Sequence, residues 1–157
     1  MKVKKIIYED FNDYKFPSMF IAFPSCTFKC EKECSQQICQ NNELVNSPNI
    51  EIDIKTIVNR YINNPLTNSI VCGGLEPFDS WKDLLDLVKY LRKSTNDDIV
   101  IFTGFNYDEI KDKITLLKQF PNIIVKFGRF IPNQEQHFDK ILGVYLASDN
   151  QFSERIS

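Results

Sequence analysis

The sequence of 157 residues has no long run of apolar side chains, and no stretch approaches the roughly 18–20 residues of a membrane-spanning helix. It has no excess of charge either, because its formal net charge is −2, and such a balance creates no strong field toward nucleic acid or an anionic membrane. Its first residues include lysines but no extended apolar segment, so no signal peptide is predicted. We therefore expect a cytoplasmic protein that binds neither nucleic acid nor a membrane.

Internal repeats, low-complexity tracts and linkers rich in glycine and serine are also missing. Hydrophobic residues make up 43% of the chain and charged residues 25%, which is typical of a globular protein. The length suffices for one hydrophobic core. We predict a single domain that spans residues 1–157.

Histidine is nearly absent, since His137 is the only one, whereas four of the five cysteines lie between Cys26 and Cys39. Three, three and four residues separate these four cysteines. An odd total and a cytoplasmic setting fit poorly with a disulfide framework. Structural zinc sites usually use two separated cysteine pairs, while a single loop of thiolates also suits an iron–sulfur cluster. The spacing alone leaves open an iron–sulfur cluster, a zinc ion, and inert or disulfide-bonded thiols.

Short apolar strands alternate with amphipathic helices along the chain. Ser80 and Asp83 predict a capped start for the second helix. This alternation predicts an α/β fold with a mostly parallel sheet. Strands are predicted at residues 3–11, 18–23, 69–74, 98–104, 122–128 and 141–148, and helices at 53–62, 80–94 and 107–120.

Three segments follow the ends of predicted strands: the cysteine loop, "GGLEPF" (residues 73–78) and "TGF" (residues 103–105). Ligands of parallel α/β sheets gather at the carboxyl ends of the strands, so we expect these segments on one rim. Paired glycines let a ligand approach the backbone, although for this motif alone an ordinary strand-to-helix turn is the better explanation. Cys72 lies inside an apolar strand and is expected to be a small buried residue. The polar segment "SDN" (residues 148–150) forms either a turn or a ligand contact.

In this order the motifs resemble those of radical S-adenosylmethionine (SAM) proteins, and the branch they resemble is the activating protein of anaerobic ribonucleoside-triphosphate reductase. "CTFKC" resembles the start of the family's Cys-x3-Cys-x2-Cys loop, and "CGGLEPF" resembles its glycine motif. "IFTGFNYDEI", "FGRFIPNQEQ" and "LASDNQFSERI" resemble later family segments. The resemblance implies an incomplete (partial) βα barrel of the radical SAM type.

The resemblance also implies a [4Fe–4S] cluster held by Cys26, Cys30 and a third cysteine. The usual third position holds Glu33, so the candidates are Cys34 and Cys39. Compactness favours Cys34, while "CQN" at residues 39–41 resembles the family's ending and favours Cys39. A second departure is Leu75, inserted before Glu76. The residues implied to bind SAM are Gly73, Gly74, Glu76, Thr103, Ser148 and Asn150.

The implied activity is that of a glycyl-radical activase. Such an enzyme uses the cluster and SAM to generate a 5′-deoxyadenosyl radical. The implied partners are a large glycyl-radical protein, such as an anaerobic ribonucleotide reductase, and an electron donor, such as flavodoxin or ferredoxin. The alternatives are a radical SAM enzyme acting on a small molecule or peptide, and a zinc-stabilised binding module or inactive relative.

Overall fold

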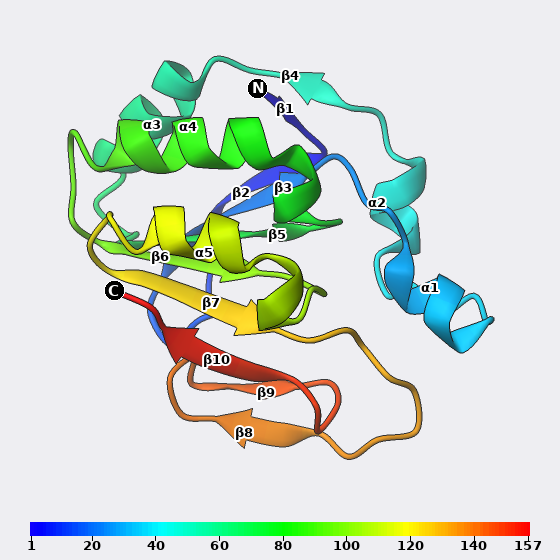
Figure 1. The fold of residues 1–157 in the computed structure, drawn as a ribbon. Helices are drawn as coiled ribbons and strands as arrows, with labels where there is room; N and C mark the ends of the chain where they lie inside the picture. Colours follow the sequence, from blue (N-terminus) through cyan, green and yellow to red (C-terminus); the bar gives the residue numbers. More distant parts are fainter.

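Six strands form the central sheet of the computed structural model, which describes residues 1–157 (Figure 1). Their order is β10–β7–β6–β5–β3–β2. The four inner strands are parallel, while β2 and β10 run antiparallel at the two edges, so the sheet is open and mostly parallel. The strands are β2 (Lys5–Asp10), β3 (Ser18–Phe23), β5 (Ser69–Gly74), β6 (Asp98–Phe102), β7 (Ile123–Phe127) and β10 (Phe152–Arg155).

The inner strands are buried on both faces, which is why their sequences are nearly continuous apolar runs. All five residues of β7 are buried, including Lys126. Cys72 in β5 is completely buried, which confirms that it is a small core residue. A lysine inside such a strand is exceptional, and it marks the place where the second face of the sheet borders a cavity.

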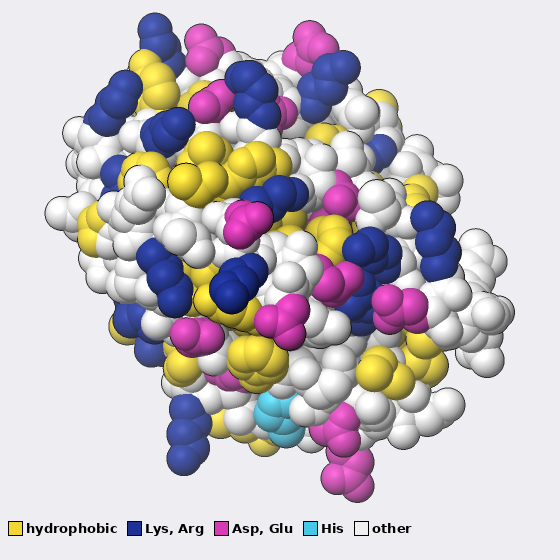
Figure 2. All heavy atoms as spheres, viewed as in Figure 1, with side chains coloured by type: hydrophobic (Ala, Val, Ile, Leu, Met, Phe, Trp, Pro, Cys, Tyr) yellow, Lys and Arg dark blue, Asp and Glu magenta, His cyan; other side chains and the backbone are white.

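Three helices cover one face of the sheet, with their apolar residues at helical spacing directed toward it (Figure 1). They are α3 (Ile54–Ile62), α4 (Trp81–Leu91) and α5 (Lys111–Leu117). The predicted cap at Ser80 does not form. A short 3-10 turn, η1 (Pro77–Ser80), precedes α4, and the Asp83 carboxylate accepts instead from the Lys2 N–H. On this side of the molecule basic and acidic side chains are interspersed (Figure 2).

A small hairpin lies against the other face of the sheet. It consists of β8 (His137–Asp139) and β9 (Val144–Leu146), which pair with each other and not with the sheet. Tyr14 and Leu142 are buried with it against the apolar residues of the inner strands. The single predicted strand at 141–148 was therefore too long, and the final strand is β10. Its four residues are exposed or half-buried and include no apolar run, because β10 is an edge strand.

The remaining elements are short. Two-residue strands β1 (Lys2–Val3) and β4 (Ile50–Glu51) pair with each other. The cysteine loop contains α1 (Lys29–Cys34) and α2 (Asn42–Asn46), and η2 (Tyr107–Glu109) precedes α5. In Figure 1 the loop lies beyond the carboxyl ends of the parallel strands. None of the helices combines the length and the apolar character needed to cross a membrane.

Candidate functional site

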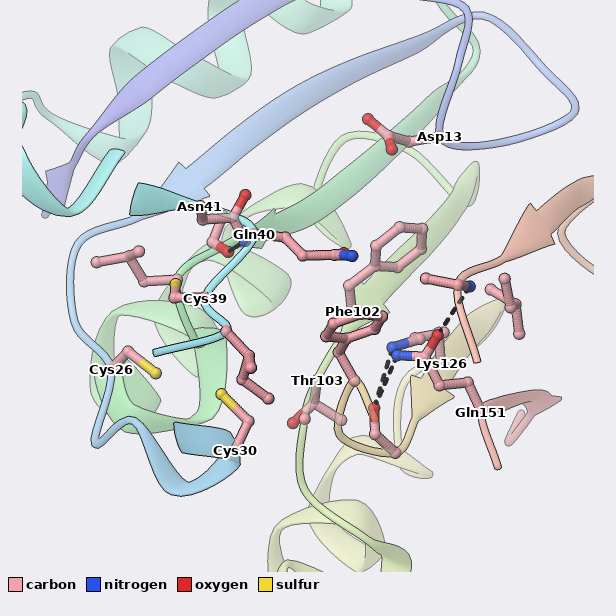
Figure 3. A pocket seen from close by; sticks show the side chains of 18 of the residues that line it. Asp13, Cys26, Cys30, Cys39, Gln40, Asn41, Phe102, Thr103, Lys126 and Gln151 are labelled. Carbon is pink, nitrogen blue, oxygen red and sulfur yellow. Dashed lines mark hydrogen bonds between the residues drawn. The ribbon is translucent and has the colours of Figure 1, made fainter. Parts of the chain in front are cut away.

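A cavity of about 330 Å³ lies at the carboxyl ends of the parallel strands. The three segments that the sequence places on one rim all contribute to its wall. The cysteine loop supplies Cys26, Cys30 and Cys39, the end of β5 supplies Gly74, and the end of β6 supplies Thr103. Figure 3 shows these side chains around a common space. The convergence follows from topology, since parallel neighbours end at the same edge.

Three of the four clustered cysteines line this cavity, and the fourth does not. Cys34, the last residue of α1, borders a separate cavity of about 80 Å³, which it shares with Cys30. All four are half-buried free thiols. Burial raises the pKa of Cys26 to about 11 and also raises the pKa of Cys30. Metal binding at this site would therefore have to displace thiol protons.

Local hydrogen bonds bring Cys39 back to the cavity after α1. Phe28 and Ser35 flank this helix in left-handed conformations, which turn the chain sharply at both ends. The backbone N–H of Cys39 donates to Glu31 Oε1 over 3.1 Å. Asn41 then donates from Nδ2 to the carbonyl of Gly74 over 2.8 Å, which ties the end of the loop to the end of β5.

The cysteines at this cavity are compatible with the ligands of a four-iron cluster. No group of three or more His, Cys, Asp or Glu side chains is arranged to hold one metal ion. In a cluster, each thiolate binds a different iron, so the ligands surround a volume instead of converging on a point. Cys26, Cys30 and Cys39 border one cavity in this way. His137 lies in β8 and takes no part.

The paired glycines have different roles. Gly74 has φ +87°, and a Cβ there would come within 2.7 Å of Ala22 Cα, so the close approach of β3 and β5 requires glycine. At Gly73 a Cβ would meet the end of the Phe20 ring at 3.0 Å. Gly74 lines the cavity, whereas Gly73 is buried behind it.

Glu76 is 4% exposed and both of its carboxylate oxygens are engaged. Oε1 accepts from the Thr103 hydroxyl over 2.8 Å and from the Phe78 N–H, while Oε2 accepts from the Gly104 N–H over 2.9 Å. Burial raises its pKa to about 7, although these three hydrogen bonds favour the ionised form. Glu76 therefore braces the wall between the ends of β5 and β6, and Leu75 is the neighbour that faces the large cavity.

Ser148 and Asn150 do not line the large cavity. Ser148 is completely buried, and its Oγ accepts from the Ile131 N–H over 3.4 Å. Asn150 donates from Nδ2 to the Arg129 carbonyl over 2.9 Å and borders the small cavity beside Cys34. Both residues thus support the loop that follows β7.

Among the cavity residues that the sequence did not indicate are two polar ones, Lys126 and Gln151. Lys126 is 9% exposed, and its Nζ donates to the carbonyl of Gly128 over 3.1 Å. Burial lowers its pKa to about 8. Gln151 donates to the same carbonyl over 3.2 Å (Figure 3). The signal for Lys126 was present, because a lysine interrupts an otherwise apolar strand, but the polar sequence around Gln151 resembles an ordinary turn.

Comparison with known families identifies the class of protein. The family model of the 4Fe-4S single cluster domain matches residues 18–151, which is most of the chain. The chain belongs to this family, which is consistent with an iron–sulfur protein. No curated protein and no solved structure matches it.

Proposed function

We propose that this protein is a radical SAM enzyme of the activating type, which generates a 5′-deoxyadenosyl radical to activate an anaerobic ribonucleotide reductase. One observation carries the proposal: three cysteines of a 4Fe-4S family domain border a cavity of about 330 Å³ that extends well beyond them. A cluster held by only three cysteines keeps one iron free for another ligand. The open sheet with its inner parallel strands is consistent with a partial barrel.

Cys26, Cys30 and Cys39 are the proposed cluster ligands. Cys39 is favoured over Cys34 because it shares the large cavity with the other two. Its backbone is held there by Glu31, and the next loop residues are held by the contact of Asn41 with Gly74. Cys34 borders only the smaller cavity, on the other side of Cys30.

The remainder of the cavity is the proposed SAM site. When bound, the cluster supplies the electron that cleaves the sulfonium of SAM. Lys126 contributes a buried cation that complements a carboxylate, and Thr103 lies between Lys126 and Cys30 (Figure 3). Gly74 also lines the cavity. Glu76 holds the Thr103 hydroxyl and thereby shapes this wall without facing the large cavity.

The proposed substrate is a large glycyl-radical protein, with flavodoxin or ferredoxin as the electron donor. Tyr145, which lines the cavity, is 69% exposed, so the cavity reaches the molecular surface. A protein substrate would cover this mouth and exclude water.

To test the proposed substrate, the reconstituted protein is mixed with SAM, a reductant and an anaerobic ribonucleotide reductase. A glycyl-radical EPR signal on the reductase supports the activase, and cleavage of SAM without any such signal favours a small-molecule or peptide substrate.

The ligand assignment is tested by replacing Cys34 and Cys39 separately with Ala and reconstituting each variant anaerobically with iron and sulfide. The wild type and Cys34→Ala should bind about four irons and show the broad absorption near ~400 nm that bleaches with dithionite. Cys39→Ala should lose both. Loss in Cys34→Ala with retention in Cys39→Ala would reverse the assignment, and one bound zinc without colour would support the zinc-stabilised module.

A further inference from the structure

Four charged side chains connect the helix that carries Cys30 to the loops beyond β6 and β7. Arg129 donates from Nη2 to Glu109 Oε1 over 2.6 Å, and Lys29 Nζ donates to the same oxygen over 3.0 Å. Arg129 Nε lies 3.2 Å from Glu33 Oε1. Lys29 and Glu33 both belong to α1, on either side of Cys30 in the sequence, so this helix is held at both of its ends.

Arg129 is the buried member of this network. Its side chain is 7% exposed, whereas those of Glu109 and Glu33 are 30% and 59% exposed. It borders both small cavities that flank Cys30, one of about 90 Å³ and one of about 80 Å³. Arg129 and Cys30 thus line two cavities in common, which places a buried positive charge near a proposed cluster ligand.

The backbone around Arg129 is built to hold it there. Gly128 has φ +99°, and a Cβ at this position would lie 3.1 Å from the Asn150 carbonyl oxygen. The Asn150 side chain in turn donates to the Arg129 carbonyl over 2.9 Å. The ring of Phe105 lies 5.9 Å from the guanidinium carbon. These contacts fix the direction in which the Arg129 side chain leaves the loop.

A fixed charge beside a cluster changes the balance between its oxidation states. Reduction adds one electron to the cluster, and a nearby positive charge stabilises the more negative, reduced form. Water and salt screen exposed charges more strongly than buried ones, so the field of Arg129 is weakened less than the field of Glu33. The sum of the four formal charges is zero, but their burial is unequal.

We propose that Arg129 is a positioning residue for the iron–sulfur centre, which holds α1 so that Cys30 faces the cavity and raises the reduction potential of the cluster bound there. The inference rests on the proposed ligand set, in which Cys30 binds an iron. The charge of Arg129 then helps to set the potential at which the cluster accepts an electron, and the identity of the cluster ligands alone does not determine this potential.

The test compares Arg129→Met, Arg129→Lys and Glu33→Gln in the full, reconstituted protein. Each is titrated with dithionite, and the EPR signal of the reduced cluster gives the midpoint potential. We expect Arg129→Met to shift the potential downward, Glu33→Gln to shift it upward, and Arg129→Lys to stay near the wild type. If Arg129 had only a structural role, Arg129→Met and Glu33→Gln would both loosen the loop and admit water. Greater solvent exposure would then raise the reduction potential of both variants.

Unchanged potentials in Arg129→Met and Glu33→Gln, or shifts of the same sign, would overturn the proposal. If Arg129→Met does not fold, as judged by far-UV circular dichroism, Arg129→Gln decides, because it removes the charge and keeps a polar side chain: a downward shift supports the proposal, and no shift or an upward shift overturns it. The rate at which a chelator strips iron gives the second readout, and we expect it to rise several-fold in Arg129→Met. Iron binding by the wild type distinguishes the role of Arg129 from the ligand set on which it rests. If the wild type does not bind about four irons, the proposed cluster ligands are wrong, and the result does not bear on Arg129.

Discussion

At the scale of single residues, the wall of the cavity depends on a buried carboxyl group. Glu76 joins the end of β5 to the end of β6 through Thr103 and Gly104. Burial raises its pKa from 4.5 to about 7, so the folded protein binds a proton more tightly here than the unfolded chain does. This group therefore stabilises the fold below pH 4.5, and the stabilisation is lost as the pH rises through 7.

Replacing Glu76 with Gln should remove this part of the pH dependence. Between pH 5 and 7.5 the free energy of unfolding of the wild type should fall relative to that of Glu76→Gln, by about 2 kcal/mol. Urea denaturation of both proteins at several pH values measures this difference. Asp13 also titrates in this range, because burial and Asp10 raise its pKa to about 6, but its contribution is the same in both proteins and cancels. Parallel pH profiles for the two proteins would contradict the assignment.

We expect an added methyl group to destabilise the fold to different extents at the two glycines of β5. Gly74→Ala should destabilise the fold by about 2–4 kcal/mol, because both its positive φ and the contact with Ala22 oppose a side chain. Gly73→Ala is the matched control, since the Phe20 ring that it meets can move. Thermal unfolding of both variants checks this, and equal losses would show that the left-handed conformation at Gly74 is not what matters.

At the scale of elements, the hairpin β8–β9 is attached to the sheet through Asp139. Its carboxylate accepts from the N–H groups of Ile141 and Leu142, both over 2.9 Å, which close the hairpin turn. It also accepts from the N–H and the hydroxyl of Ser153 in β10, over 3.0 and 2.6 Å. One side chain thus joins an isolated two-stranded unit to the edge of the main sheet.

Asp139→Ala should therefore loosen the hairpin more than the rest of the protein. We expect a loss of about 2–4 kcal/mol, because several buried donors lose their acceptor. Hydrogen exchange should accelerate in residues 137–146 before it changes in β5 and β6. Asp149→Ala is the control, because this exposed side chain forms no ion pair, and it should leave exchange unchanged. Uniform acceleration across the sheet in Asp139→Ala would mean that Asp139 stabilises the whole fold instead of the hairpin.

The sequence predicts the inner strands, the edge strand β2 and the three helices that cover the sheet, and it misses β8 and β10, for a physical reason. Strands buried on both faces need continuous apolar residues, and helices on the sheet need apolar residues at helical spacing, so both leave a clear pattern. β10 and β8 lack such a pattern because each is exposed along part of its length. Their structure depends on tertiary contacts such as those of Asp139, which no local pattern encodes.

At the scale of the whole molecule, the position of the site follows from the topology, while its composition does not. Parallel strands bring Gly74, Thr103 and the cysteine loop to one edge, and the order of elements in the sequence predicts this. Spacing could not distinguish Cys34 from Cys39, because the path of the loop depends on hydrogen bonds to Glu31 and Gly74. Lys126 lies within β7 and not in a loop, so a search for motifs that follow the ends of strands does not find it.

If the cavity beside the three cysteines holds SAM for reductive cleavage, as we propose, the protein should form the products of that cleavage. The reconstituted protein is incubated anaerobically with SAM and dithionite, and 5′-deoxyadenosine and methionine are quantified by liquid chromatography. We predict that both products form in equal amounts with the wild type and with Cys34→Ala, and that neither forms with Cys39→Ala. An intact four-iron cluster in the wild type without 5′-deoxyadenosine would contradict the account and identify the protein as an iron–sulfur protein without radical SAM activity.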